Sequence, residues 1–120
     1  MGMVALDVNG HRLDVRLEDN SSAQAFAALL ADGPITVPMD DYANMEKVGP
    51  LPQSLPRNDA QTSVGPGDVI LYQGSQITVY YDTNAWNFTK LGHVQGMDEA
   101  ELRDALGAGS VEATFSLLER

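Results

Sequence analysis

MVALDVNGHRLDVRL, residues 3–17, is the stretch that decides the fold, because it has the pattern of a β-hairpin. Apolar residues alternate with small or polar ones up to Val8 and again from Leu13 to Leu17, which is the period of strands with one buried face. Asn9-Gly10 lies between the two runs, and this pair tolerates the positive φ values of a type I′ turn. The stretch therefore predicts two antiparallel strands.

Two short helices are predicted further along the chain. The first follows the N-cap candidates Asn20–Ser22 and ends at Gly33, which can adopt a left-handed conformation. The second covers Met97–Leu106, where Asp98 and Glu101 have the spacing of a capping box.

The remaining apolar runs are short and have the alternation of strands. They are Ile35–Met39, Val69–Tyr72, Ile77–Tyr81, Asn87–Val94 and Val111–Leu117. Asp82–Trp86 is predicted to be a polar connection. Asp40–Pro66 contains four prolines, and because each removes a backbone donor, we expect a long loop there that carries the site.

These elements predict a mainly β fold of about six to eight strands with two helices. Successive strands are joined by turns rather than helices, which favours a closed antiparallel barrel or a sandwich over a parallel sheet. At 120 residues, without a repeat or an internal linker, we expect one domain over residues 1–120.

The charge and composition exclude several classes of function. Seventeen Asp and Glu outnumber seven Lys and Arg, so the net charge is −10, and such a chain repels nucleic acids and anionic membranes. There is no cysteine, hence no disulfide or thiolate chemistry, and a reducing cytoplasm is the expected location. We expect neither nucleic acid nor membrane as a partner, and a monomer or weak dimer.

No catalytic or cofactor motif stands out. His11 and His93 lie far apart, and the chain has no G-x-S-x-G, HExxH or phosphate-loop pattern. Asp40, Asp41 and Glu46 form an acidic group without the spacing of a calcium loop. We therefore expect no metal and no cofactor.

Aromatic residues concentrate in and beside the loops that join strands. Tyr80 and Tyr81 must face opposite sides of a strand, so one can be core and the other can line a groove. Trp86 is either a wall of a pocket or a plug at the end of the barrel. The candidate groove, at the mouth of the barrel, is predicted to be lined by Tyr42, Glu46, Arg57, Tyr72, Tyr81 and Trp86.

Three blocks of the sequence resemble the bacterial cyclophilin-like domain family. They are DDYANMEKVGPLPQSLP (residues 40–56), VGPGDVILYQGSQITVYYD (64–82) and FTKLGHVQGM (88–97), and the pattern YxxxEKxGxLP over residues 42–52 is the most distinctive. The resemblance implies a closed antiparallel β-barrel of about eight strands, capped by two helices.

The resemblance also implies prolyl cis/trans isomerisation as a candidate activity, in which an arginine stabilises the twisting amide. The cyclophilin strand F-H-R-V-I has no counterpart here, and Arg57 is the one arginine in the candidate loop. We therefore expect the fold without efficient catalysis, and the binding of a small molecule or an extended peptide. The alternatives are a weak prolyl isomerase that uses Arg57 and a structural or interaction module.

Overall fold

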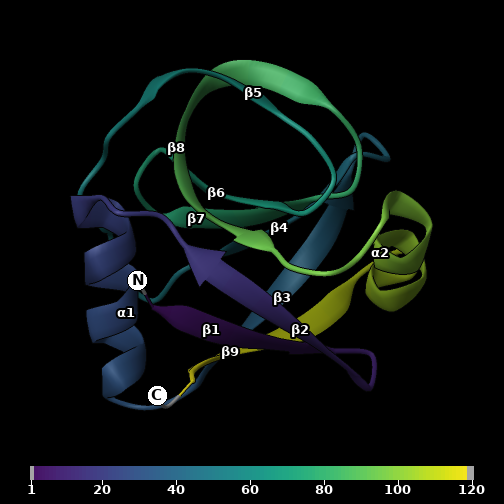
Figure 1. Cartoon of the computed structure of the whole chain (residues 1–120), viewed down its shortest axis with the longest axis horizontal. Helices are drawn as coiled ribbons and strands as arrows, with labels where there is room; N and C mark the ends of the chain where they lie inside the picture. The colour runs from purple at the N-terminus through teal and green to yellow at the C-terminus, as the bar shows by residue number, and fades with distance from the viewer. Residues whose placement is uncertain (1, 119–120) are drawn as a thin grey trace.

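Nine strands and two helices follow one another along residues 2–118, the part of the chain that the computed structural model describes (Figure 1). The ends of the predicted domain, residue 1 and residues 119–120, lie outside this range. The elements are β1 (Met3–Val8), β2 (His11–Leu17), α1 (Ser21–Ala31), β3 (Ile35–Tyr42), β4 (Glu46–Pro50), β5 (Ala60–Val64), β6 (Asp68–Tyr72), β7 (Gln76–Tyr80), β8 (Asn84–Val94), α2 (Glu99–Leu106) and β9 (Val111–Leu117).

Eight of these strands form a closed antiparallel ring. The pairing order is β2-β1-β9-β3-β4-β7-β6-β8, and β8 returns to β2 through the pairs Val15–Val94 and Leu17–Gly92. The remaining strand, β5, pairs with the first half of β8 and lies outside the ring. The predicted fold class, mainly β with a closed antiparallel arrangement and two helices, is confirmed.

The turn and the helix caps predicted from the sequence are found at the predicted residues. Asn9 and Gly10 have φ values of 52° and 77°, as the turn between β1 and β2 requires. The Asn20 side chain accepts a hydrogen bond from the Ala23 amide at 2.7 Å and caps α1. Asp98 and Glu101 form the predicted capping box, so that α2 begins two residues later than predicted.

The interior of the ring holds the main apolar core, and the helices cover it on two sides (Figure 1). Val69 and Leu71 of β6 face this core, together with residues of α1 and α2. Ile70, between them, faces outward and belongs to a second, smaller cluster with Val64, Tyr80 and Phe88. The outer face of the sheet is therefore also covered by apolar side chains, beneath β5 and β8.

The prediction of one loop over Asp40–Pro66 was wrong. In the structure β3 continues to Tyr42, the strands β4 and β5 lie within the interval, and residues 51–59 between them remain irregular. Pro50 is the last residue of β4, and the other three prolines lie outside strands, so proline ended the strands rather than preventing them.

The last long strand also begins earlier than predicted. β8 starts at Asn84 rather than Asn87, because residues 84–88 pair with β5. Trp86 therefore lies in a strand, opposite Thr62, and not in a connection. We call β5 and residues 84–88 of β8 the arch, because Figure 1 shows them curving over β6 and β7.

None of the helices in the described residues has both the length and the apolar run needed to cross a bilayer.

Candidate functional site

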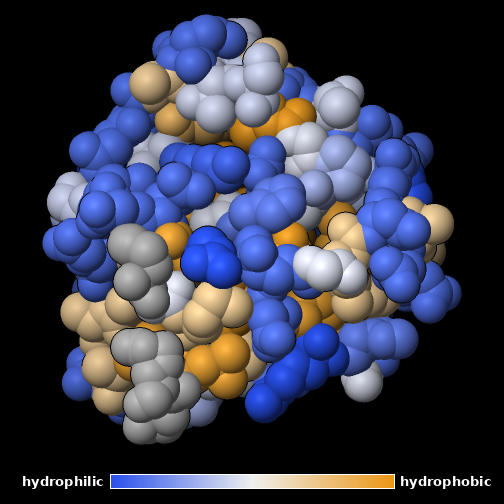
Figure 2. Space-filling model, in the orientation of Figure 1, coloured by the Kyte–Doolittle hydropathy of each residue, from blue (hydrophilic) through white to orange (hydrophobic). Residues whose placement is uncertain are grey.

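A pocket of about 390 Å³ lies between the arch and the outer face of β4, β6 and β7. We call it the aromatic pocket. Figure 2 shows hydrophobic and weakly polar residues near the top of the molecule, where the arch lies in Figure 1, and further hydrophobic residues at the lower left, near α1. The lining residues are Tyr42, Met45, Glu46, Val48, Tyr72, Gln76, Thr78, Tyr80, Asn84, Trp86 and Phe88.

The strand register builds the floor of the aromatic pocket. Glu46 of β4 pairs with Tyr42 of β3 on one side and with Tyr80 of β7 on the other. Directly paired residues point to the same face of an antiparallel sheet, so these three side chains form one row. Val48 and Thr78 form the next row on the same face, two residues along each strand.

The arch supplies the roof. Asn84, Trp86 and Phe88 alternate along β8, so they share the face that looks toward the ring. Phe88 is buried, and its ring lies 5.8 Å from the ring of Tyr80 and 6.1 Å from that of Tyr72, measured between centroids. These three packed rings hold the arch against the sheet.

Two aromatic residues at the pocket are open to solvent. Tyr42 and Trp86 are each 60% exposed, whereas most large apolar side chains of the described chain are buried. An exposed indole beside a pocket offers a wide apolar surface and one hydrogen-bond donor to a ligand.

Glu46 is the acidic group of the pocket, and it is buried. Burial raises the pKa of Glu46, and the charge of Asp41 adds to the increase, while a hydrogen bond with Tyr80 partly offsets it. Burial and the nearby Glu46 also raise the pKa of Tyr80, whose hydroxyl accepts a hydrogen bond from Asn84 at 3.3 Å. The lining includes no Lys, Arg or His.

Four of the six predicted site residues line the aromatic pocket: Tyr42, Glu46, Tyr72 and Trp86. They lie at the outer wall of the ring and on the arch above it, and not at the mouth of the ring, where the sequence led us to expect the groove. Sequence reasoning missed Tyr80, Asn84 and Phe88. The alternation Asn84, Trp86, Phe88 was the available signal, and the assignment of Asp82–Trp86 to a connection hid it.

Tyr81 lies elsewhere, at a second hollow of about 390 Å³ beside α2. Its hydroxyl donates to Asp41, and the Arg103 guanidinium lies 4.8 Å from the centre of its ring. Burial and the contact with Asp41 raise the pKa of Tyr81 to about 12. Asp41 in turn lies 3.2 Å from the fully buried Lys47 Nζ, which donates to the Gly109 carbonyl at 2.6 Å. This arrangement joins β3, β4 and the segment that follows α2.

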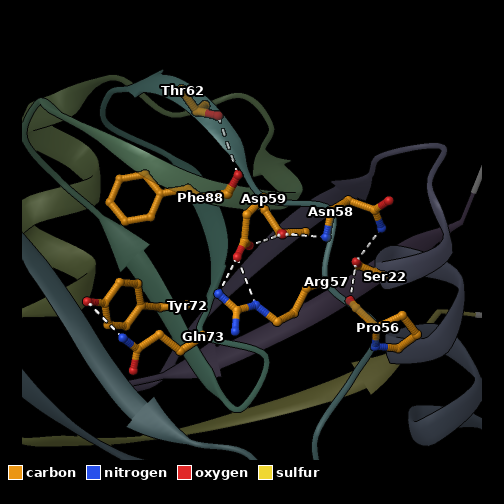
Figure 3. Close-up of polar contacts among 10 residues, drawn as sticks. Ser22, Pro56, Arg57, Asn58, Asp59, Thr62, Tyr72, Gln73 and Phe88 are labelled. Atoms are coloured by element: carbon orange, nitrogen blue, oxygen red, sulfur yellow. Dashed lines mark hydrogen bonds and ion pairs between the residues drawn. The ribbon is translucent and has the colours of Figure 1, made fainter.

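Arg57 does not line the aromatic pocket either. Its Nε donates to Asp59 at 2.8 Å, and its side chain is 55% exposed (Figure 3). The surrounding segment, residues 51–59, is tied down by side chains on two elements. The side-chain amide of Asn58 donates to the Ser22 hydroxyl of α1 at 2.7 Å, and the backbone amide of Asn58 donates to the Thr89 hydroxyl of β8 at 2.8 Å. Arg57 and its neighbours therefore form a fixed strap that is bonded to both α1 and β8.

No group of three or more His, Asp or Glu residues close enough to hold a metal ion occurs within residues 2–118.

Fold and site together define a class of protein, a closed antiparallel β-ring with two helices and a pocket on its outer wall. The Cyclophilin-like family matches residues 6–116, nearly the whole chain, and the protein belongs to this family. The resemblance found in the three sequence blocks is thereby confirmed. No curated protein shows significant similarity to the chain.

Proposed function

We propose that this protein binds a small molecule in the aromatic pocket and does not catalyse prolyl isomerisation efficiently. The observation that carries the proposal is the pocket itself, whose aromatic walls surround a buried carboxylate. Its volume of about 390 Å³ falls within the range of small-molecule sites, which is about 300–1,000 Å³. This volume favours a small molecule over an extended peptide that would need a longer groove.

The weak-isomerase alternative has less support. Electrostatic stabilisation of a twisting amide needs a donor aimed at the reacting group, and the lining of the aromatic pocket contains no guanidinium. Arg57 is engaged by Asp59. A protease-coupled assay on an X-Pro peptide, with wild type and Arg57→Ala, tests this alternative: a rate above background that the substitution abolishes would revive it.

A thermal-shift screen of chemically diverse small molecules tests the main proposal. We expect ligands that raise the melting temperature of the wild type and lose this effect in Trp86→Ala. Leu117→Ala is the matched control, because Leu117 is also a large exposed apolar residue but lies on β9, outside the pocket. If no compound shifts the wild type, or if both variants respond alike, the proposal is wrong.

The interaction-module alternative rests on β5. Within the described residues this strand pairs only with β8, so its other edge is free to add a strand from a partner. Sedimentation of the protein at high concentration tests self-association, and a monomer throughout would count against a dimer through this edge. The cytoplasmic location expected from the cysteine-free sequence belongs to the same set of proposals, and cell fractionation tests it.

A further inference from the structure

The lining of the aromatic pocket contains an acidic side chain but no basic one. Five aromatic rings and one carboxylate line it, and no basic side chain does: the rings are those of Tyr42, Tyr72, Tyr80, Trp86 and Phe88, and the carboxylate is that of Glu46. Aromatic faces carry partial negative charge, and they attract cations that lie over them. The aromatic rings and the carboxylate therefore favour a positively charged ligand, and no basic side chain of the lining opposes one.

The two buried carboxylates among residues 2–118 differ in a way that supports this view. Asp68 is fully provided with partners: Lys90 Nζ lies 3.2 Å away, His93 Nδ1 lies 2.7 Å away, and the Gly65 amide donates at 2.9 Å. Glu46 takes part in no ion pair within the same residues. Buried carboxylates are rarely left without a positive partner, because removing a charge from water is unfavourable.

The position of Glu46 allows a ligand to provide the missing partner. Its side chain lies in the floor of the pocket, in the row between Tyr42 and Tyr80. Trp86 approaches the same space from the arch, and Tyr42 and Trp86 are the exposed members of the set. A positive group that enters the pocket from solvent therefore has the exposed rings of Tyr42 and Trp86 and the carboxylate of Glu46 within the same lining.

We propose that the ligand of the aromatic pocket carries an organic ammonium group, which Glu46 pairs with and the surrounding aromatic rings enclose. This proposal rests on the proposed small-molecule binding and names the ligand's chemical class. An ammonium group can belong to a free small molecule or to a lysine side chain of a peptide. The pocket volume favours the free molecule, and the experiment below separates the two sources.

Isothermal titration calorimetry of the full chain with matched probes tests the charge directly. Choline and 3,3-dimethylbutan-1-ol have the same shape, but only choline is charged. We expect choline to bind the wild type about tenfold or more tightly than the neutral alcohol. A third arm uses a short peptide with trimethyllysine and its acetyllysine counterpart, which retains the length of the side chain without the positive charge.

Two variants locate the effect. We expect Glu46→Gln to weaken choline binding about tenfold or more. Glu112→Gln, on the exposed side of β9, removes the same charge from the chain and should leave the affinity unchanged. The comparison between choline and its neutral analogue uses the wild type alone, so it holds even where a variant folds poorly.

The outcomes are distinguishable. If the neutral probes bind as tightly as the charged ones, or if Glu46→Gln and Glu112→Gln behave alike, the ammonium proposal is overturned while small-molecule binding stands. If the trimethyllysine peptide binds and choline does not, the ammonium chemistry is supported with a peptide as its source. If no charged probe binds, the ammonium proposal fails, and the broader ligand screen decides separately whether the pocket binds anything.

Discussion

The charged form of Glu46 destabilises the folded protein, although the same carboxylate is the acidic group of the aromatic pocket. Because burial and Asp41 raise its pKa in the folded state, with Tyr80 offsetting part of the effect, the unfolded chain ionises at lower pH than the folded one. Stability therefore falls as the pH rises from about 4.5 through the folded pKa.

Replacing this carboxylate should accordingly stabilise the free protein near neutral pH. We expect Glu46→Gln to raise the melting temperature at pH 7, and we expect the gain to shrink toward pH 4, where the wild-type side chain is also neutral. Melting curves of both proteins across this range measure it. A variant that melts below the wild type at both pH values would contradict the assignment of Glu46 as an unpaired buried charge.

Asp68 should behave in the opposite way. Burial alone raises its pKa, but the hydrogen bonds from Gly65, His93 and Lys90 outweigh burial and leave the pKa below the usual 3.8. Its contribution to stability is thus complete above the unfolded pKa and is lost as the pH falls through the folded pKa.

We expect Asp68→Asn to lower the free energy of unfolding by about 2 kcal/mol at pH 7, because three hydrogen bonds to a charged acceptor are weakened. The difference from the wild type should shrink as the pH falls from about 4 toward 2. Urea unfolding at several pH values provides the measurement, and a difference that stays constant with pH would be inconsistent with the bonded carboxylate.

Part of the site was predictable at the level of single residues, and part was not. Tyr42, Glu46 and Trp86 stood out because aromatic and acidic side chains beside loops are typical of pockets. Alternation required Tyr80 and Tyr81 to face opposite sides, but it does not say which side is the core. That choice depends on the pairing of Glu46 with Tyr80 and on the contact of Tyr81 with Asp41, both of which join residues distant in sequence.

Among the elements, the strap of residues 51–59 has a buried hydroxyl, that of Thr89, as one of its anchors. Thr89 is fully buried, accepts from the Asn58 amide at 2.8 Å and donates to Asp59 at 2.6 Å. Thr89→Val keeps the shape and removes both bonds, so we expect a loss of about 1–3 kcal/mol in the free energy of unfolding.

Thr36→Val is the control for this substitution. Thr36 bonds to Thr114 at 2.9 Å on an exposed surface, where water can replace the lost partner. We expect its effect to stay within about 0.5 kcal/mol. Chemical denaturation of both variants settles the comparison, and equal effects would mean that Thr89 does not anchor the strap.

Elements with local signals were predictable from the sequence, and elements defined by distant partners were not. The hairpin at Asn9-Gly10 and the capping box of α2 are each encoded within a few residues. The extension of β3 to Tyr42 and the strand β4 arise from pairing with each other and with β7. The strand β4 has no apolar alternation that could be recognised in the sequence. Its inward positions are occupied by Lys47 and Gly49 rather than by large apolar residues.

For the molecule as a whole, closure of the ring depends on a glycine. Gly92 of β8 pairs with both Leu17 of β2 and Val69 of β6, and a Cβ atom there would lie 2.5 Å from the Arg16 carbonyl oxygen. We expect Gly92→Ala to lower the free energy of unfolding by about 1–3 kcal/mol or more, since backbone must shift to admit the methyl group.

Gly65→Ala supplies the contrast. A Cβ at Gly65 meets no atom within 4 Å, and the backbone there does not have a positive φ. The substitution should be neutral or stabilise by up to about 1 kcal/mol. Denaturation of the two variants side by side measures the difference, and a Gly92→Ala protein as stable as Gly65→Ala would show that the β2–β8 contact tolerates a wider spacing.

The exposed position of Trp86 on the arch has a practical consequence, because it is the sole tryptophan of the chain. Indole fluorescence excited at its red edge reports on the arch and not on the interior of the ring. The arch rests on the small cluster of Val64, Ile70, Tyr80 and Phe88, whereas the ring encloses the larger core. The emission signal should therefore change at lower denaturant than circular dichroism, so that light from one side chain records when the arch detaches from a ring that is still folded.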